Sequence, residues 1–393
     1  MTREIVIVGG GLAAQRCCET LRRDGWDGAI RMICAEPDPP YDRPPLSKAA
    51  LANPATAPVF RPRDWYRDHE VEVLLGRRAE SLDIGARCVR LTSGDAVPYA
   101  RLLVATGADP VVPPPLARYR NVHTLRNFCD ASRLRAVLGP GRRLAVVGAG
   151  FLGLEAAATA RTIGTDVALI DIASVPLSRV LPPEVGSWFK AVHREEGVEM
   201  HLGDGVAAVE ADGDEIRALS LGSGRTVRCD AVLVAVGVRP ATGWLGADGA
   251  LATDSSGHTV LPDVFAAGDA AAWPEPETGA PTWSQQWEAA AREGAAAAKA
   301  MLGLAVPRST APFFWTDQYG IRVQQLGTHR NADRSTVDGD PGQRDFALTW
   351  HRGRRVVGGL LVNRPRELAR LRESIGRHEE LKGGDHELQS ADR

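Results

Sequence analysis

Two glycine-rich segments of the same design constrain this chain more than any other feature. IVIVGGGLAA at residues 5–14 and LAVVGAGFLG at residues 144–153 each join a short apolar run to glycines and then to a helix-like stretch. Glycines permit a tight turn, and they let the backbone approach a pyrophosphate at the helix N-terminus. One such motif is weak evidence, because glycines occur in many turns. Two copies in the same context predict two dinucleotide-binding units.

The first dinucleotide-binding segment has its motif positions at Gly9, Gly11 and Ala14, where alanine is an accepted third residue. A helix is expected to run to Arg23, and the strand AIRMICAE then ends at Glu36. A carboxylate at this place can accept hydrogen bonds from an adenosine ribose. The sequence therefore predicts a β-turn-α-β nucleotide site with Glu36 at its ribose end.

The second dinucleotide-binding segment repeats the pattern. A helix is expected to run to Ile163, and the strand DVALID then ends at Asp171. A carboxylate there binds both ribose hydroxyls and repels a 2′-phosphate, and neither residue that follows is an arginine. NADH is therefore expected in preference to NADPH. The glycines of this motif are Gly148, Gly150 and Gly153.

Later segments indicate how the domains are joined. RLLVATGADP at residues 101–110 and AVLVAVGVRP at residues 231–240 each read as a buried strand that leaves its sheet at a glycine, where the chain crosses between domains. VFAAGDAA brings Asp269 to the end of another strand, and an alanine-rich helix is expected from about Trp283 to Leu302. Short strands such as RVQQLG, FALTW and RVVGGLLV follow Pro307, and the charged tail HEELKGGDHELQSADR is expected to fray.

Composition narrows the functional classes. With 393 residues and a formal net charge of −2, the chain has room for two or three domains and no bulk charge that favours nucleic acid or an anionic membrane. IVIVGG reads as a strand rather than a signal peptide, and no apolar run is long enough to span a bilayer. The six cysteines have neither disulfide-framework nor metal-site spacing, so a reducing cytoplasm and no metal site are expected.

Seven stretches together resemble the FAD-dependent NADH:ferredoxin reductases of oxygenase systems, which have a glutathione-reductase-like flavoprotein fold. They span the chain almost from end to end. The most specific to this family are PYDRPPLSK at residues 40–48 and FWTDQY, which is part of the stretch FFWTDQYGIRVQQLG at residues 313–327. The others are IVIVGGGLAA, LLVATGADP, VVGAGFLGLEAA, VGVRP and VFAAGDAA.

The resemblance implies an α/β chain with two Rossmann-like dinucleotide-binding domains and an α+β C-terminal interface domain. The FAD-binding domain would comprise residues 1–108 and 237–306, the NADH-binding domain residues 109–236, and the interface domain residues 307–393. FAD would be bound tightly but not covalently, and NADH would be the electron donor. Electrons would pass to a small, acidic [2Fe–2S] or similar ferredoxin that feeds a cytochrome P450 or a ring-hydroxylating dioxygenase.

The resemblance also implies residue roles. Lys48 would lie at the flavin N5 edge, where Glu155 also points, and the two would shape the nicotinamide site as the catalytic pair; Lys48 would stabilise negative charge on the reduced flavin. A surface lysine and a helix-N-terminal acid are the plain alternatives. The residues implied for FAD are Gly9, Gly11, Ala14, Glu36, Arg43, Lys48, Thr106, Gly107, Gly268, Asp269, Trp287 and Trp315, and those for NADH are Gly148, Gly150, Gly153, Glu155 and Asp171.

The chain departs from the family in the helix that covers the flavin. Relatives commonly read W-x-N-A before a Q-G pair, whereas this chain has Ala289 in place of the amide and Glu293 before Gly294. The hydrogen-bond surroundings of Trp287 are therefore not carried over from the family. Trp287 and Trp315 could also be ordinary core aromatics.

Arginines give the C-terminal domain a local basic character that could steer an acidic ferredoxin. A solvated face with acids such as Glu367 and Glu373 nearby is the commoner fate of such a charge run. The arginines are Arg352, Arg354, Arg355, Arg364, Arg366 and Arg370.

Other activities of the same fold stay open. The region around residues 40–48 lacks the cysteine of related peroxidases, and the adjacent Cys17 and Cys18 would diverge on a helix and form no redox pair. The remaining enzymatic alternatives are an NADH reductase for rubredoxin and an NADH oxidase. A different class is a redox-switch binding protein that resembles apoptosis-inducing factor.

Overall fold

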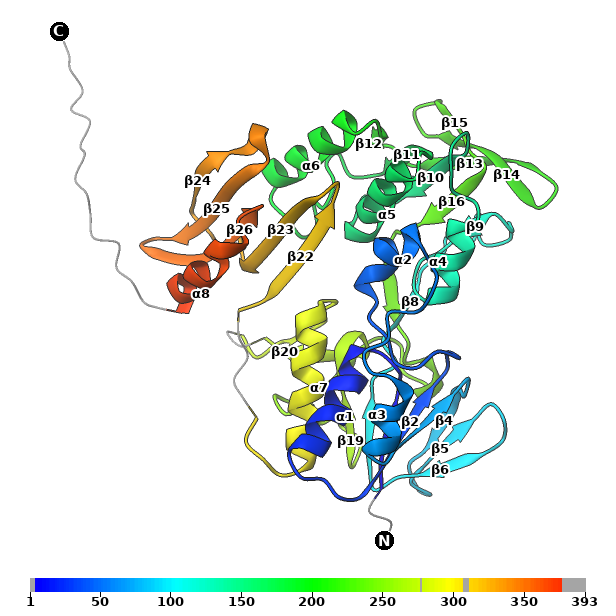
Figure 1. Ribbon diagram of the computed structural model, residues 1–393, viewed down its shortest axis with the longest axis vertical. Coiled ribbons are helices and arrows are strands. Elements are labelled where there is room, and N and C mark those ends of the chain that lie inside the picture. The colour runs from blue at the N-terminus through cyan, green and yellow to red at the C-terminus, as the bar shows by residue number, and fades with distance from the viewer. Residues whose placement is uncertain (1–3, 276–277, 307–310, 377–393) are drawn as a thin grey trace. The chain divides into compact units, whose positions relative to one another are not determined.

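The computed structural model describes residues 4–275, 278–306 and 311–376. The chain divides into two compact units, Met1–Ser309 and Thr310–Arg393. The predicted α/β class with parallel sheets is confirmed, whereas the tail expected to fray lies outside the described residues (Figure 1).

A five-stranded parallel sheet forms around the first glycine motif. Its central strand, β1 (Glu4–Val8), is buried along its whole length, as expected of a parallel strand covered on both faces. The helices α1 (Leu12–Arg23) and α7 (Trp287–Met301) pack against each other, and a Cβ on Gly294 would lie 2.1 Å from the Ala13 carbonyl oxygen. The strand order is β19 (Val264–Ala266), β7 (Arg101–Val104), β1, β2 (Ala29–Cys34) and β3 (Val71–Leu75).

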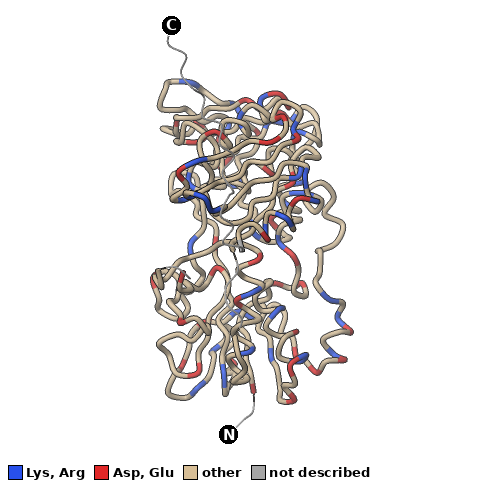
Figure 2. The backbone as a smooth tube through the Cα atoms, turned by 90° about the vertical axis from the view of Figure 1, so that its left-hand side faces the viewer, with Lys and Arg blue, Asp and Glu red and all other residues tan. Residues whose placement is uncertain are grey.

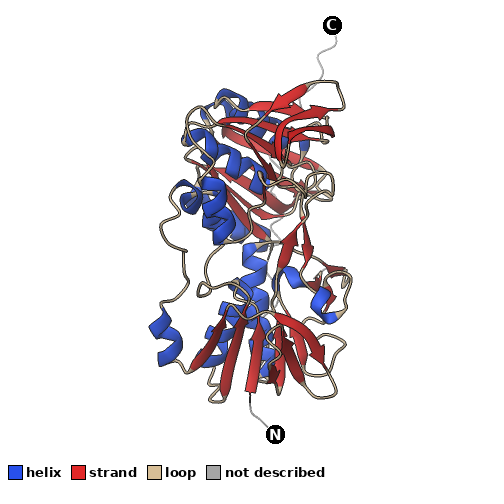
Figure 3. Cartoon of the chain, turned by 90° about the vertical axis from the view of Figure 1, so that its right-hand side faces the viewer, coloured by secondary structure: helices blue, strands red, loops and turns tan. Residues whose placement is uncertain are grey.

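A second five-stranded parallel sheet forms around the second motif and repeats this design (Figures 1 and 3). In both sheets the strand before the glycines lies between two other strands. One is the next strand in the chain, and the other is the strand that follows a small three-stranded sheet in the sequence. The helices of this half are α4 (Phe128–Arg135), α5 (Phe151–Thr162) and α6 (Pro183–Glu195). The strand order is β12 (Glu199–Leu202), β11 (Asp166–Asp171), β10 (Arg143–Val147), β16 (Ala231–Val234) and β9 (Val122–His123).

Small sheets, antiparallel except for one pair of strands, complete the unit Met1–Ser309. The two segments at which the chain is expected to cross between domains contain the strands β8 (Ala108–Pro110) and β17 (Val238–Pro240), which pair with each other. The other sheets are β4 (Ala79–Asp83), β5 (Cys88–Leu91) and β6 (Ala96–Pro98); β13 (Val206–Asp212), β14 (Glu215–Leu221) and β15 (Thr226–Arg228); and β18 (Leu251–Ala252), β20 (Ala271–Pro274) and β21 (Pro281–Thr282), of which β18 and β20 run parallel. Short helices are η1 (Pro44–Ser47), α2 (Ala49–Ala52), α3 (Arg63–Asp68), η2 (Gly243–Leu245) and η3 (Gly268–Ala270).

The second unit is an antiparallel five-stranded sheet with the helix α8 (Leu368–Gly376) packed on it. The strands predicted from RVQQLG, FALTW and RVVGGLLV are present, and Trp350 is the largest side chain of its core. The strand order is β22 (Phe313–Gln318), β23 (Ile321–Gly327), β26 (Arg355–Val362), β25 (Asp345–Arg352) and β24 (Arg334–Asp340), with η4 (Pro341–Gln343) and η5 (Pro365–Glu367) between elements.

Two predicted element ends differ from the structure. The strand β2 ends at Cys34, so Glu36 lies on the loop that follows. The helix α7 begins at Trp287 rather than near Trp283, because Thr282 pairs with β20 and the Trp283 indole donates to the Asp269 carbonyl at 2.8 Å. The later start of α7 is set by contacts with residues earlier in the chain.

Charge and hydropathy are unremarkable along the described chain. Basic and acidic residues are interspersed along the tube in Figure 2. None of the helices within the described ranges has the length and apolar character that a bilayer crossing requires.

Candidate functional site

The two glycine loops share one backbone geometry. Gly9 has a φ of 131°, and a Cβ added to it would lie 2.1 Å from the Ala105 carbonyl oxygen. Gly148 has a φ of 113°, and its Cβ would lie 2.3 Å from the Ala235 carbonyl oxygen. Both conditions exclude any side chain, so each glycine is required where its loop crosses the end of the neighbouring strand.

Each loop leads into a helix whose N-terminus can receive an anion. Gly11 and Gly150 are the N-cap residues of α1 and α5, and neither helix has a side-chain cap. A Cβ at either glycine would meet no atom within 4 Å. Uncapped amides beside open space fit a phosphate-bearing ligand, because these amides have no intrahelical partner and the helix dipole favours negative charge.

The third motif position differs between the loops. Ala14 is completely buried in α1, so a methyl group is accommodated there. At Gly153 a Cβ would lie 2.0 Å from the Gly148 carbonyl oxygen, so the helix α5 lies too close to its loop for alanine. The structure thus accounts for the variant residue in the first motif.

Asp171 stands beside the second glycine loop. Its Oδ2 accepts a hydrogen bond from the Ala149 amide at 2.6 Å, and its Oδ1 accepts one from the Ala173 amide at 2.7 Å. These two bonds fix the carboxylate at the end of β11. Each carboxylate oxygen keeps a further lone pair for a hydroxyl group.

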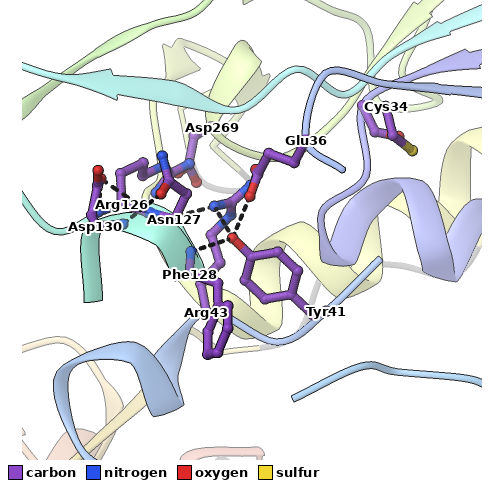
Figure 4. A network of polar contacts seen from close by, with 10 residues as sticks. Cys34, Glu36, Tyr41, Arg43, Arg126, Asn127, Phe128, Asp130 and Asp269 are labelled. Atoms are coloured by element: carbon purple, nitrogen blue, oxygen red, sulfur yellow. Dashed lines mark hydrogen bonds and ion pairs between the residues drawn. The ribbon is translucent and has the colours of Figure 1, made fainter. Parts of the chain in front are cut away.

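Glu36 belongs to a polar network at the first loop (Figure 4). The guanidinium of Arg43 lies 2.8 Å from Glu36 Oε1, and the Tyr41 hydroxyl donates to Glu36 Oε2. Tyr41 in turn accepts a hydrogen bond from the Phe128 amide at 2.9 Å. The network therefore joins PYDRPPLSK to the start of α4.

Arg126 extends this network and was not foreseen from the sequence. It pairs with Asp269 at 3.1 Å, and its carbonyl accepts from Arg43 at 2.5 Å. Burial lowers the pKa of Arg126, and the nearby Arg43 guanidinium adds to this effect. Because Arg126 lies outside every motif, only the three-dimensional contacts place it among the candidate residues.

Lys48 and Glu155 form an ion pair between the two halves of the first unit. Lys48 Nζ lies 2.6 Å from Glu155 Oε2, and the Ser47 hydroxyl donates to the same oxygen. The Thr159 hydroxyl also donates to the Ser47 carbonyl at 2.7 Å, which ties η1 to α5. The side chains of Lys48 and Glu155 are 20% and 9% exposed. Glu155 is not in the first turn of its helix, so its environment is this pair rather than the helix terminus.

The segment around Asp269 is held from several directions. The Gly268 amide donates to Glu293 Oε2 at 2.9 Å, and Gly268 has a φ of 69°. Burial raises the pKa of the Glu293 carboxyl to about 8, and Asp269 adds to the shift. The departure from the family at Glu293 therefore introduces a buried titratable group beside the Asp269 turn.

Thr106 and Gly107 lie between β7 and β8, where they contact the chain that returns at Ala241. The Thr106 hydroxyl donates to the Ala241 carbonyl at 2.8 Å, and the Ala241 amide donates to the Gly107 carbonyl at 2.9 Å. Gly107 has a φ of 74°, and its Cβ would lie 2.9 Å from a nitrogen of Arg126. Thr106 thus has a structural partner where a cofactor role was expected.

The two tryptophans have different settings. The Trp287 indole donates to Asp42 Oδ1 at 2.7 Å, which joins α7 to PYDRPPLSK. Burial raises the pKa of Asp42. Trp315 lies on β22 in the second unit and stacks on Phe313, with ring centroids 6.1 Å apart.

The cysteines provide no redox pair among the described residues. All six are free thiols, five of them buried and Cys129 exposed. Burial raises the pKa of Cys17, and it raises that of Cys18 to about 12. Neither thiol is activated as a nucleophile.

Comparison with known proteins places these features in a family. The profile of the pyridine nucleotide-disulphide oxidoreductases matches residues 3–294, and a reductase C-terminal profile matches residues 313–387. A 3-phenylpropionate/cinnamic acid dioxygenase ferredoxin–NAD(+) reductase component from Photorhabdus laumondii is 35% identical over 96% of this chain and 98% of its own length. Rhodocoxin reductase from Rhodococcus erythropolis is 33% identical, over 92% and 87% of the two chains.

A solved structure shows the same fold. The covalent complex of putidaredoxin reductase with putidaredoxin matches with a TM-score of 0.90 and 31% identity, over 95% of this chain and 93% of the other. The family expected from the sequence is thus confirmed along nearly the whole chain. The protein belongs to the pyridine nucleotide-disulphide oxidoreductases, in the branch that carries the reductase C-terminal domain.

Proposed function

We propose that this protein is a flavoprotein reductase that passes electrons from NADH through FAD to a small iron–sulfur ferredoxin. The observation that carries the proposal is the contact of Lys48 with Glu155. Lys48 belongs to the segment next to the first glycine loop, and Glu155 belongs to α5, the helix that follows the second glycine loop. Two nucleotide sites that share one largely buried ion pair suit electron transfer between the nucleotides.

FAD is assigned to the first loop. The uncapped N-terminus of α1 would hold its pyrophosphate, and Glu36 would hold the adenosine ribose. The network of Arg43, Arg126 and Asp269 lies beside this site and brings positively and negatively charged side chains to it. We assign the other FAD contacts to Thr106, Gly107, Gly268, Trp287 and Trp315. Residues 1–108 and 237–306 would form the FAD-binding domain, and the many contacts available would hold FAD tightly without a covalent bond.

NADH is assigned to the second loop, within a domain of residues 109–236. The uncapped amides of α5 would face the pyrophosphate, and Asp171 would accept hydrogen bonds from the ribose hydroxyls. The same carboxylate would repel a 2′-phosphate, so NADH would be preferred to NADPH.

A bound flavin supplies the chemistry, since it accepts a hydride from NADH and gives up electrons one at a time. The chain supplies position and charge. Lys48 would face the flavin N5 edge and stabilise negative charge there, while Glu155 orients the ammonium group and lines the nicotinamide site. The low exposure of both side chains strengthens this electrostatic effect, because little water screens the pair.

A ferredoxin is the proposed electron acceptor. The relatives with ferredoxin–NAD(+) reductase names and the putidaredoxin complex support this class of partner. We further propose that the ferredoxin is acidic and of the [2Fe–2S] type, that it docks near the arginines of residues 307–393, and that the reaction takes place in a reducing cytoplasm. Arg364 is already neutralised by Asp338 and Asp345, so the other arginines of that group would provide the attraction.

The test is an anaerobic titration of the purified protein, recorded as an absorbance spectrum. Yellow protein that is bleached by one equivalent of NADH, and more slowly by NADPH, supports the two nucleotide assignments. Electrons that then reach cytochrome c only when a ferredoxin is present support the acceptor. Transfer to rubredoxin or oxygen alone would favour the corresponding alternative, and a colourless protein that binds no FAD would refute the proposal.

A further inference from the structure

A cavity lies at the end of the second parallel sheet where its strands begin. It has a volume of about 460 Å³, which is within the usual range of small-molecule sites. Asn121, Arg142 and Asp230 line it, and they directly precede the strands β9, β10 and β16. These strands run parallel, and β10 leads to the glycine loop at its other end. The cavity and the proposed nucleotide site therefore lie at opposite ends of the same strands.

The frame of the cavity is held in place by Asn121, which is 7% exposed. Its side-chain nitrogen donates to the Ile216 carbonyl at 2.9 Å and to the Asp230 carbonyl at 3.0 Å. Its side-chain oxygen accepts a hydrogen bond from the Ile216 amide at 2.9 Å. These three bonds join the starts of β9, β14 and β16, so the shape of the cavity is set by the sheets around it.

The two carboxylates that line the cavity already have partners. Glu215 lies 2.6 Å from Arg120 and 2.7 Å from Arg217, and both arginines also line the cavity. Asp230 Oδ2 accepts a hydrogen bond from the Arg143 amide at 2.8 Å. Acidic side chains therefore neutralise much of the charge of Arg120 and Arg217.

Two donors in the cavity have no such partner. Within the described ranges, the Arg142 guanidinium has neither an ion pair nor a hydrogen bond, and it is exposed. Nε2 of His123 is buried and likewise has no hydrogen-bond partner there. Burial lowers the pKa of His123, so its ring is neutral at pH 7 and can donate from this nitrogen. A buried polar atom without a partner costs free energy, which a ligand that pairs with it would recover.

The cavity also has an apolar wall. Ala136 and Val137, at the end of α4, supply it. A ligand that suits all of these groups carries a negative charge at one end and an apolar body at the other. A guanidinium pairs with a carboxylate through two parallel hydrogen bonds, so a carboxylate fits the charged end.

We infer that this cavity binds a small organic acid. Arg142 and His123 would hold its carboxylate, and Val137 would contact its apolar part. Inorganic phosphate would pair with Arg142 but would leave the apolar wall uncovered. The inference does not depend on the proposed function, because neither nucleotide takes part in it.

The test compares Arg142→Ala with the matched control Arg143→Ala on the FAD-loaded protein. Arg143 is the next residue and is also exposed, but its side chain does not line the cavity. Val137→Asp is a second variant, since it adds a carboxylate to the apolar wall. Calorimetry measures the binding of three probes: phenylacetate, its uncharged analogue 2-phenylethanol, and inorganic phosphate. The phenylacetate titration is repeated in the presence of ADP-ribose, which would occupy the nucleotide site.

We expect phenylacetate to bind the unsubstituted protein and Arg143→Ala equally, and to bind Arg142→Ala and Val137→Asp about tenfold more weakly or worse. The binding of 2-phenylethanol should be weaker than that of phenylacetate by a similar factor, and ADP-ribose should not compete. Equal affinities of Arg142→Ala and Arg143→Ala would overturn the inference, and so would phosphate binding as tight as that of phenylacetate. Displacement by ADP-ribose, or no binding at about 10 mM phenylacetate, would also overturn it.

Discussion

Lys48 Nζ lies 2.6 Å from Glu155 Oε2, and 107 positions separate these residues in the chain. Lys48 follows η1, next to the polar network of the first glycine loop, whereas Glu155 lies on the helix that leaves the second. Ser47 shares the same carboxylate oxygen, so Glu155 has two donors from one segment. The pair is the point at which the two proposed nucleotide sites meet.

Replacing either member of this pair should slow hydride transfer more than it weakens NADH binding. We expect Glu155→Gln to lower the rate of flavin bleaching by about tenfold or more, because Lys48 loses the charge that orients it; a tenfold change corresponds to about 1.4 kcal/mol. Stopped-flow absorbance over a range of NADH concentrations separates the limiting rate from the dissociation constant.

The double variant Lys48→Met/Glu155→Gln is the control for this prediction. Its bleaching rate should be close to that of the slower single variant, because the residues act as a pair. Independent residues would instead give a fold reduction equal to the product of the two single-variant fold reductions. Fully additive effects would show that the two side chains act independently.

The second glycine loop offers a matched pair of substitutions. Gly148→Ala places a Cβ 2.3 Å from the Ala235 carbonyl oxygen, at a φ of 113°, so we expect a loss of stability of about 2 kcal/mol or more. Gly150→Ala meets no atom within 4 Å and has an ordinary φ of −77°, so its unfolding should be nearly unchanged while NADH binding weakens. Thermal unfolding of both variants, with and without NADH, distinguishes the two effects, and equal melting temperatures would contradict this account.

The Asp171 carboxylate should determine which nicotinamide dinucleotide is used. Asp171→Asn keeps an acceptor for one of the two backbone amides and removes the charge that repels a 2′-phosphate. We expect NADH to bind about tenfold more weakly and the affinity for NADPH to change little. The preference for NADH over NADPH therefore becomes smaller. The ratio of the two dissociation constants is the measurement, and an unchanged ratio would count against the role of Asp171.

Glu293 should make stability depend on pH. Its pKa is about 8 in the folded protein, above the ordinary value of 4.5, so the folded state binds more protons than the unfolded state between these values. The free energy of unfolding should therefore fall as the pH rises from about 5 to 8, by at most about 5 kcal/mol since one pKa unit corresponds to about 1.4 kcal/mol. Chemical denaturation at several pH values measures this slope.

Glu293→Gln removes the titration and keeps an oxygen that can accept from the Gly268 amide. Its pH profile over the same range should be flatter than that of the unsubstituted protein, and its stability at pH 8 should be higher. Parallel profiles would show that Glu293 does not titrate in this range.

The parts predicted from the sequence are those in which local pattern and chemistry agree. Gly9 and Gly148 each have a positive φ and lie close to the carbonyl group of a neighbouring strand's end. The spacing of the glycines in the sequence predicts both features. The duplicated parallel sheets follow from the same motifs. Lys48 and Glu155 could be paired only through the family resemblance, since nothing in their local sequence relates them.

The parts that the sequence could not predict depend on contacts between distant segments. Arg126 pairs with Asp269, 143 positions later, and no motif marks either its charge or its burial. Arg142 and His123 line one cavity because β9 and β10 both pair with β16. The later start of α7 has the same origin, since Trp283 is held by the Asp269 carbonyl.

The most direct test of the central claim is the transfer of electrons from NADH to a ferredoxin under anaerobic conditions. The protein, pre-reduced with NADH, is mixed in a stopped-flow instrument with an acidic [2Fe–2S] ferredoxin, and the flavin and iron–sulfur absorbances are followed together. We predict flavin reoxidation that matches ferredoxin reduction, with two ferredoxins reduced per NADH and a rate that falls as salt is added. A flavin that stays reduced with every ferredoxin tried but reoxidises rapidly in oxygen would contradict the proposed function.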